Sequence, residues 1–122
     1  FLGVAGCLGA LARYGLSLWI QRGLGLGFPL GILVTNSIGC FLFGLIWELT
    51  EQRSWINSDI RLAVLVGFLG AYTTMSTFAF DTVQLARSGQ WVEAFGNVLL
   101  TNTLGFGLAL AGIWLGKAIS TA

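Results

Sequence analysis

Four long apolar stretches are separated by three short polar connections along the chain. Each stretch is close to the ~20 residues that a helix needs to cross a bilayer. The stretches cover about residues 1–20, 29–48, 61–87 and 93–117. The pattern predicts one all-α transmembrane domain over residues 1–122, folded as a four-helix bundle in a membrane.

The third apolar stretch differs from the others because hydroxyl groups are concentrated within it. Thr73, Thr74, Ser76 and Thr77 occupy four of five consecutive positions, and two glycines precede them. β-Branched threonines lower helix propensity, and Ser and Thr side chains compete for backbone hydrogen bonds. We predict a break in this helix over about residues 70–77, with a kinked but continuous helix as the alternative. Carbonyls freed at a break suit a hard cation, and freed N–H groups suit an anion.

The composition also indicates a membrane protein, and it excludes several functions. The chain is 56% hydrophobic with only 9% charged residues, whereas about 25% is usual in soluble domains. Its net charge of +1 gives no basis for binding nucleic acid. Histidine is absent, which excludes a Ser-His-Asp triad within one chain, and we expect no enzymatic activity. Cys7 and Cys40 lie in apolar stretches and are expected to be buried thiols rather than a disulfide.

The basic residues between the spans are almost evenly divided between the two sides of the membrane. Four spans place Arg53, Arg61 and Lys117 on the side of both termini, and Arg22 and Arg87 on the other. Lysine and arginine bias sets membrane orientation, and three against two is almost no bias. The balance favours a chain that inserts in both orientations and forms an antiparallel homodimer, with a weakly biased single topology as the alternative.

Glycines are frequent in the apolar stretches. Gly112 and Gly116 form a GxxxG pattern on the fourth, and Gly6 and Gly9 lie along one face of the first. Small residues at this spacing let helices approach closely. They are compatible with contact between two subunits or within one bundle, and the pattern does not decide between the two.

Polar side chains inside the predicted spans are candidates for function because each needs a partner away from water. Asn36 lies near the middle of the second span, and Asn97 and Thr101 lie one turn apart on the fourth. Met75 and Phe78 are three residues apart on the third and share a face wherever the backbone is helical. Hydrogen bonding between helices and ordinary packing are the structural alternatives for these residues.

Glycine-rich runs with fixed polar positions recur in all four stretches, and together they resemble a known family. The runs are GCLGALARY from Gly6, GILVTNSIGCFLFG from Gly31, GFLGAYTTMSTF from Gly67 and NVLLTNTLG from Asn97. In this order they resemble the Fluc (CrcB) family of fluoride channels over essentially the whole chain. The resemblance implies a dual-topology antiparallel homodimer in the bacterial inner membrane, which expels fluoride passively through two pores.

The resemblance also implies roles for individual residues. A fluoride pore would be lined by residues of the second, third and fourth spans, namely Asn36, Met75, Ser76, Thr77, Phe78, Asn97 and Thr101. A structural sodium ion at the dimer centre would be held by the backbone carbonyls of Gly70 and Thr73. Met75 stands where the family has a phenylalanine, which we interpret as an engineered substitution. Because a thioether has no positive ring edge, we expect altered rather than abolished conduction.

Two other classes of function compete with a channel. A proton-coupled antiporter of the small multidrug-resistance type has a similar size, but it needs a carboxylate in the middle of the first span. That span offers only Arg13, and the acidic residues all lie at or near predicted span ends. A non-conducting structural membrane subunit would not need the hydroxyl cluster of the third span.

Overall fold

The computed structural model describes residues 1–24, 27–51 and 56–121. Its helices are α1 (Leu2–Leu24), α2 (Leu30–Thr50), α3 (Ser58–Leu62), the π-helix η1 (Ala63–Leu69), α4 (Gly70–Tyr72), α5 (Met75–Arg87) and α6 (Trp91–Thr121). The described residues contain no strand. Four helical segments are long and apolar enough to cross a membrane, which confirms the prediction of an all-α chain with four spans.

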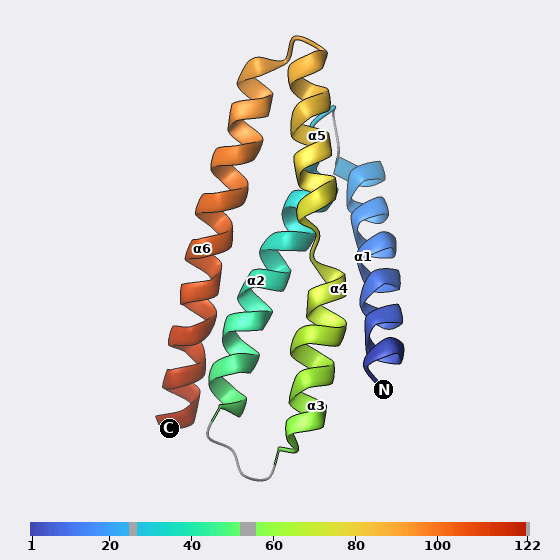
Figure 1. Ribbon diagram of the computed structural model, residues 1–122. Coiled ribbons are helices and arrows are strands. Elements are labelled where there is room, and N and C mark those ends of the chain that lie inside the picture. The colour runs from blue at the N-terminus through green and yellow to red at the C-terminus, as the bar shows by residue number, and fades with distance from the viewer. Residues whose placement is uncertain (25–26, 52–55, 122) are drawn as a thin grey trace.

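The third span is assembled from four helical pieces stacked end to end. In Figure 1, α3 and α4 lie in its lower half and α5 forms its upper half, and only α5 lies beside α6. Both termini lie at the end of the bundle where α3 begins, and α5 and α6 meet at the other end. Asn57 begins α3, since its side-chain oxygen accepts a hydrogen bond from the Asp59 N–H over 2.7 Å.

Two helices continue beyond the apolar stretches that predicted them. The first ends at Leu24 instead of about residue 20, and the last at Thr121 instead of about residue 117. Polar residues are tolerated in these turns because they lie beyond the hydrocarbon layer. The extra turn of α1 has a structural use, because Gln21 donates to the Phe28 carbonyl and accepts from the Gly31 N–H, both over 2.9 Å.

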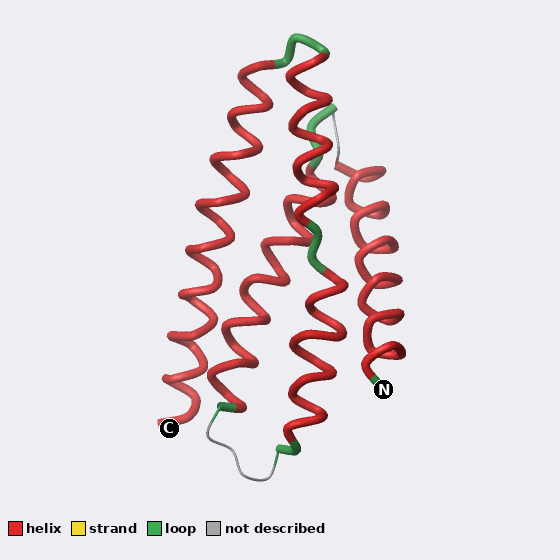
Figure 2. The backbone as a smooth tube through the Cα atoms, viewed as in Figure 1, coloured by secondary structure: helices red, strands yellow, loops and turns green. Residues whose placement is uncertain are grey.

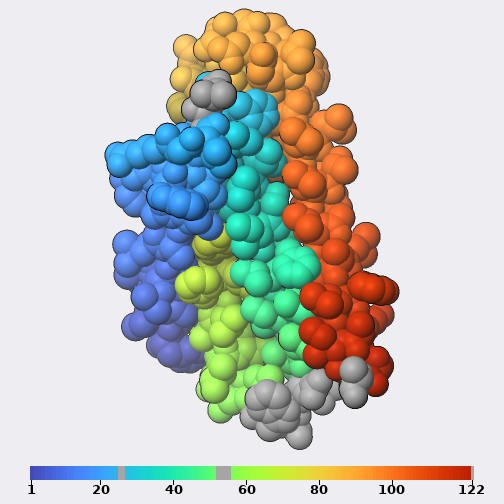
Figure 3. All heavy atoms as spheres, turned by 180° about the vertical axis from the view of Figure 1, so that it is seen from behind, coloured from blue at the N-terminus to red at the C-terminus, as the bar shows by residue number. Residues whose placement is uncertain are grey.

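Close contact between α2 and α6 is made by glycines. Gly44 lies against the Ala109 carbonyl, and Gly112 lies against the Phe41 carbonyl and the Leu45 N–H, so closely that a Cβ at either glycine would overlap backbone. The GxxxG pattern of the fourth span is therefore used for packing inside the chain. Figure 3 shows the resulting order of helices, with α2 between α1 and α6.

A second contact joins α1 to the third span. Gly9 of α1 lies directly on the Phe68 backbone of η1. Leu65, Leu69 and Tyr72 form the buried core beside this contact. The glycines of the first span are thus also used within one chain. The prediction that Cys7 is a buried thiol is wrong, because its side chain on α1 is exposed. The outward face of α1 meets lipid or another protein, where an apolar thiol is tolerated without burial.

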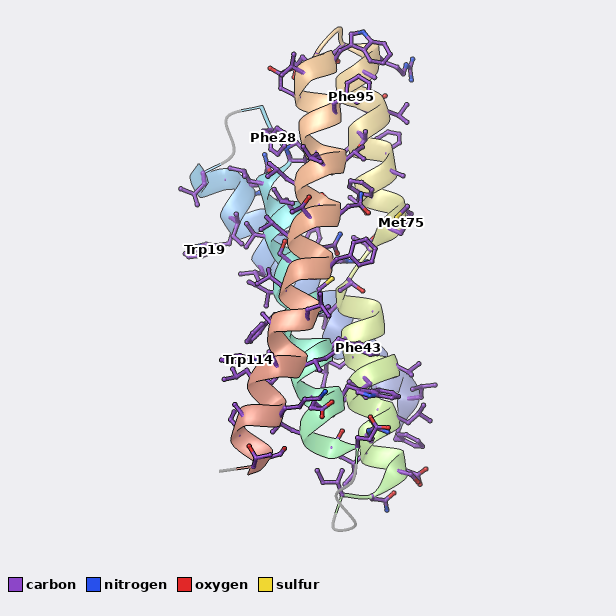
Figure 4. All side chains as sticks on the ribbon, turned by 90° about the vertical axis from the view of Figure 1, so that its left-hand side faces the viewer. Trp19, Phe28, Phe43, Met75, Phe95 and Trp114 are labelled. Carbon is purple, nitrogen blue, oxygen red and sulfur yellow. The ribbon has the colours of Figure 1, made fainter. Side chains whose placement is uncertain are left out.

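Tryptophans lie at both ends of the spans. Trp19, Trp91 and Trp114 expose 73%, 59% and 71% of their surface, as residues of an interfacial aromatic belt do. Figure 4 shows Trp19 and Trp114 pointing away from the bundle.

The α2–α6 contact predicts a large effect of one added methyl group. Gly112→Ala should destabilise the protein by about 2 kcal/mol, because the new Cβ forces two backbones apart. Gly107→Ala is the matched control on the same helix, since nothing lies within 4 Å of its Cβ position. Thermal unfolding in detergent should show a lower midpoint for the first variant only. Equal midpoints would contradict the packing described.

Candidate functional site

The third span changes its backbone conformation between α4 and α5. Thr73 has φ −88° and ψ 155°, and Thr74 has φ −147° and ψ 120°, so both residues are extended. Figure 2 shows this short segment as the non-helical piece in the middle of the span. An extended segment inside a membrane leaves backbone groups without their helical partners, which must be bound by something else.

Asn36 of α2 binds the extended segment with both ends of its amide. Its Nδ2 donates to the Thr74 carbonyl over 2.9 Å, and its Oδ1 accepts from the Thr74 N–H over 2.8 Å. One side chain thus satisfies both backbone groups of Thr74. The sequence left Asn36 open between a structural and a functional role, and these two bonds establish the structural one. The second Nδ2 hydrogen has no acceptor among the described residues.

Thr74 also begins the next helix. Its Oγ1 accepts from the Thr77 N–H over 3.2 Å and lies within 3.2 Å of the Thr77 hydroxyl and 3.3 Å of the Ser76 hydroxyl. This is an N-cap, which satisfies one of the free N–H groups in the first turn of α5. Three hydroxyls of the predicted cluster are therefore brought together at the start of α5, where the helix dipole is positive.

Backbone carbonyls at the end of α4 lose their usual donors at this segment, and those of Gly70 and Thr73 are among them. In a continuous helix the Gly70 carbonyl would accept from the Thr74 N–H, but that N–H donates to Asn36. The Thr73 carbonyl would accept from the Thr77 N–H, which instead donates to the Thr74 hydroxyl. Gly70 is exposed and Thr73 half-buried. Both carbonyl oxygens therefore fit the role of ligands for a hard cation at the surface of the chain.

The sequence did not predict the π-helix η1 that precedes this segment. It covers Ala63–Leu69, and the Gly70 N–H completes it by donating to the Leu65 carbonyl five residues earlier. π-Helices widen the turn and are frequent near functional sites. The residues of η1 form an ordinary apolar run, AVLVGFL, and carry no signal that distinguishes a π-helix from an α-helix.

Asn97 joins α6 to α5 through a residue that the sequence analysis missed. Its Nδ2 donates to the Thr82 hydroxyl over 2.9 Å, and that hydroxyl donates to the Phe78 carbonyl over 2.8 Å. The Thr101 hydroxyl extends the series by donating to the Asn97 Oδ1 over 3.4 Å. Asn97 is only 2% exposed. Thr82 lies one turn after Phe78 on α5. This spacing lets the threonine hydroxyl bind the Phe78 carbonyl, and it was the signal in the sequence that could have found Thr82.

Met75 and Phe78 lie in different environments in the isolated chain. Met75 exposes 73% of its surface, whereas Phe78 exposes 8%. Figure 4 shows Met75 on the outer side of α5, pointing away from the other helices. The structure therefore does not bring these two side chains together within one chain, and Ser76 beside Met75 is also exposed.

Exposed polar residues continue on α6. Asn102 and Thr103 are exposed well inside this helix, where Asn102 donates from Nδ2 to the Val98 carbonyl over 2.8 Å. The surrounding surface is apolar, with Phe106 exposing 72% and Leu99 68% of their areas. Polar groups at this depth need either protein or water beside them. Asn102 and Thr103 are therefore expected to lie beside protein or water rather than beside lipid alone.

These features define a multi-pass helical membrane protein whose third span contains an extended segment held by an asparagine amide. The family model described as CrcB-like protein, Camphor Resistance (CrcB), matches residues 1–113, and the chain belongs to this family. It is 47% identical over 119 residues to a protein of Desulforapulum autotrophicum named "Fluoride-specific ion channel FluC", covering 98% of this chain and 95% of that protein. A protein of the same name from Nitrosococcus oceani is 45% identical, with 98% and 93% covered.

The Asn36 side chain should protect the backbone amide of Thr74 from hydrogen exchange. Asn36→Ala removes both partners of Thr74 and should increase hydrogen exchange at the Thr74 amide by about tenfold or more, since a lost buried hydrogen bond costs about 1–3 kcal/mol. Asn102→Ala is the control, because its amide binds only its own helix. Hydrogen–deuterium exchange in detergent or nanodiscs provides the measurement. Unchanged exchange at Thr74 would show that the amide does not hold this segment.

Proposed function

We propose that the chain forms a fluoride-selective channel that lets fluoride leave the cell passively. The observation that carries this proposal is the extended segment Thr73–Thr74. Hydroxyls gather after it, at the start of α5, and backbone carbonyls before it have lost their helical donors. The relatives named as fluoride-specific ion channels, which are 45–47% identical over nearly the full chain, support it. Export would take place across a bacterial inner membrane.

Selectivity would come from replacing the water around fluoride with fixed donors. Fluoride is small and strongly hydrated, so a pore must offer several donors at short range. The Ser76 and Thr77 hydroxyls, the second hydrogen of the Asn36 amide and the positive end of α5 lie close together and supply them. Thr101 and Asn97 continue a polar line along α6. The ring edge of Phe78 would add a weak positive contact.

The pore would be completed by a second, antiparallel copy of the chain, giving two pores per homodimer. Exposure of Met75, Ser76 and Asn102 at membrane depth supports a second copy, because these faces lack a partner in one chain. The structure places Arg61 and Lys117 at one end of the bundle and Arg22 and Arg87 at the other. This near balance of charge supports insertion in both orientations.

A sodium ion would be held where the two copies meet. Carbonyl oxygens are the ligands that hard cations prefer, and the Gly70 and Thr73 carbonyls have both lost their helical donors. Two carbonyls from each copy would surround one ion. When bound, the ion would supply positive charge that fixes the extended segments of both copies.

A proton-coupled antiporter fits the chain less well. α1 contains no carboxylate, and its charged residues are Arg13 and Arg22. Glu48 and Glu93 lie near helix ends, where they face the interface rather than the middle of the membrane. A passive pore needs no proton-carrying group, and a non-conducting subunit would give no ion flux when reconstituted alone.

The purified protein in potassium-loaded liposomes with a potassium shunt should release fluoride and retain chloride. Selective release follows from a narrow pathway that offers hydroxyl, amide and backbone donors. An ion-selective electrode records each ion in the external solution. Release of both ions at similar rates, or of neither ion from the Met75→Phe variant, would contradict the proposal.

Met75→Phe should increase fluoride efflux about threefold to tenfold. An aromatic edge at this position would contribute about 0.5–1.5 kcal/mol that the thioether cannot. The control is Val92→Phe, which adds a ring at an 83% exposed position in the first turn of α6. Initial efflux rates at equal protein content give the comparison. A similar change in both variants would mean that Met75 does not face the ion.

Sodium should stabilise the protein more than potassium or N-methylglucamine does. Raising a ligand to about 100 times its dissociation constant stabilises by about 2.7 kcal/mol, which unfolding midpoints in detergent detect. Gly70→Ala should reduce the sodium effect, although its Cβ meets only the Leu65 carbonyl at 3.8 Å within the chain. Gly96→Ala is the control, with nothing within 4 Å. Equal stabilisation by all three cations would contradict the proposed sodium site.

A further inference from the structure

Arg61 is held in one orientation at the end of α2. Its Nε donates to the Thr50 hydroxyl over 2.8 Å, and its Nη2 donates to the Trp47 carbonyl over 3.3 Å. Its Cζ lies 4.1 Å from the centre of the Trp47 ring, which is a cation–π contact. The Thr50 hydroxyl in turn donates to the Ile46 carbonyl over 2.6 Å. A long side chain that is usually flexible is thus fixed in advance.

The fixed guanidinium keeps unused donors. Of its five N–H groups, two are occupied by Thr50 and Trp47, which leaves three within the described part of the chain. Among the described residues, no salt bridge joins Arg61 to a carboxylate. The positive charge is therefore held in place without a carboxylate partner in the described part of the chain.

An apolar cavity lies beside the same guanidinium. It has a volume of about 230 Å³ and is lined by Ile46, Thr50, Ile56, Ile60, Arg61 and Val64. Four of these side chains are purely aliphatic. Thr50 is the last residue of α2, and Trp47 lies one turn earlier, so the cavity is at the level of the membrane interface. It combines a surface that suits a hydrocarbon chain with one cation at the headgroup level.

We propose that this cavity binds one anionic phospholipid. Its phosphate would accept hydrogen bonds from the free N–H groups of Arg61, and part of an acyl chain would lie against Ile46, Ile60 and Val64. Charge complementarity selects this occupant, because an anionic headgroup leaves the arginine charge paired. A zwitterionic headgroup brings its own cation close to the guanidinium. The proposal does not depend on ion conduction.

Native mass spectrometry of the purified protein with added lipid tests the proposal. Phosphatidylglycerol should bind about fivefold more tightly than phosphatidylcholine, which corresponds to about 1 kcal/mol for one arginine near an anionic headgroup. Arg61→Gln should reduce this preference to about one. Arg87→Gln is the matched control, because Arg87 lies at the other end of the third span, where its side chain donates to Gln84 over 3.3 Å.

A second variant keeps the test decisive if Arg61→Gln unfolds. Ile60→Trp starts from a 59% exposed residue, leaves Arg61 in place and fills the cavity, so it should also abolish the preference. Glycerol phosphate alone should not compete with the lipid, since it lacks the acyl chain. Equal binding of the two lipids, a preference that survives both variants, or full competition by glycerol phosphate would each overturn the proposal.

Discussion

The structure depends on one requirement of the bilayer, which is that each backbone N–H and C=O inside it needs a hydrogen-bond partner. Helices meet this requirement without help, and the two extended residues Thr73 and Thr74 do not. Asn36 supplies both partners of Thr74 from a neighbouring helix. This single amide allows α4 to end and α5 to begin within the membrane. The hydroxyls at the start of α5 and the released carbonyls before it both follow from that interruption.

Much of the fold could be predicted because bilayer thickness sets the length of apolar segments. Four spans and their connections followed from this length alone. The use of the glycines could not be predicted, since close packing within a chain and between chains needs the same small residues. Only the positions of the Phe41 and Ala109 backbones decided that Gly112 and Gly44 pack inside the bundle. The extra turns of α1 and α6 could not be predicted either, because the length of an apolar stretch does not include the polar residues at its ends.

The candidate site could be predicted less completely. The threonine cluster indicated where the helix would lose regularity, because its residues compete with helical hydrogen bonds. The partner of each group depends on tertiary contacts, so the pairing of Asn36 with Thr74 and of Asn97 with Thr82 could not be read from spacing. The exposure of Met75 beside the buried Phe78 is equally a property of the packed chain.

We propose that fluoride binds at the start of α5, where an extended segment, an amide and two hydroxyls lie together. Solid-state NMR of the isotope-labelled protein in bilayers tests this claim most directly, with fluoride compared against chloride at equal ionic strength. The account predicts that the Asn36 side-chain amide and the backbone amides of Ser76 and Thr77 shift with fluoride only. Signals that stay unchanged at these three residues, or that shift equally with both ions, would contradict it.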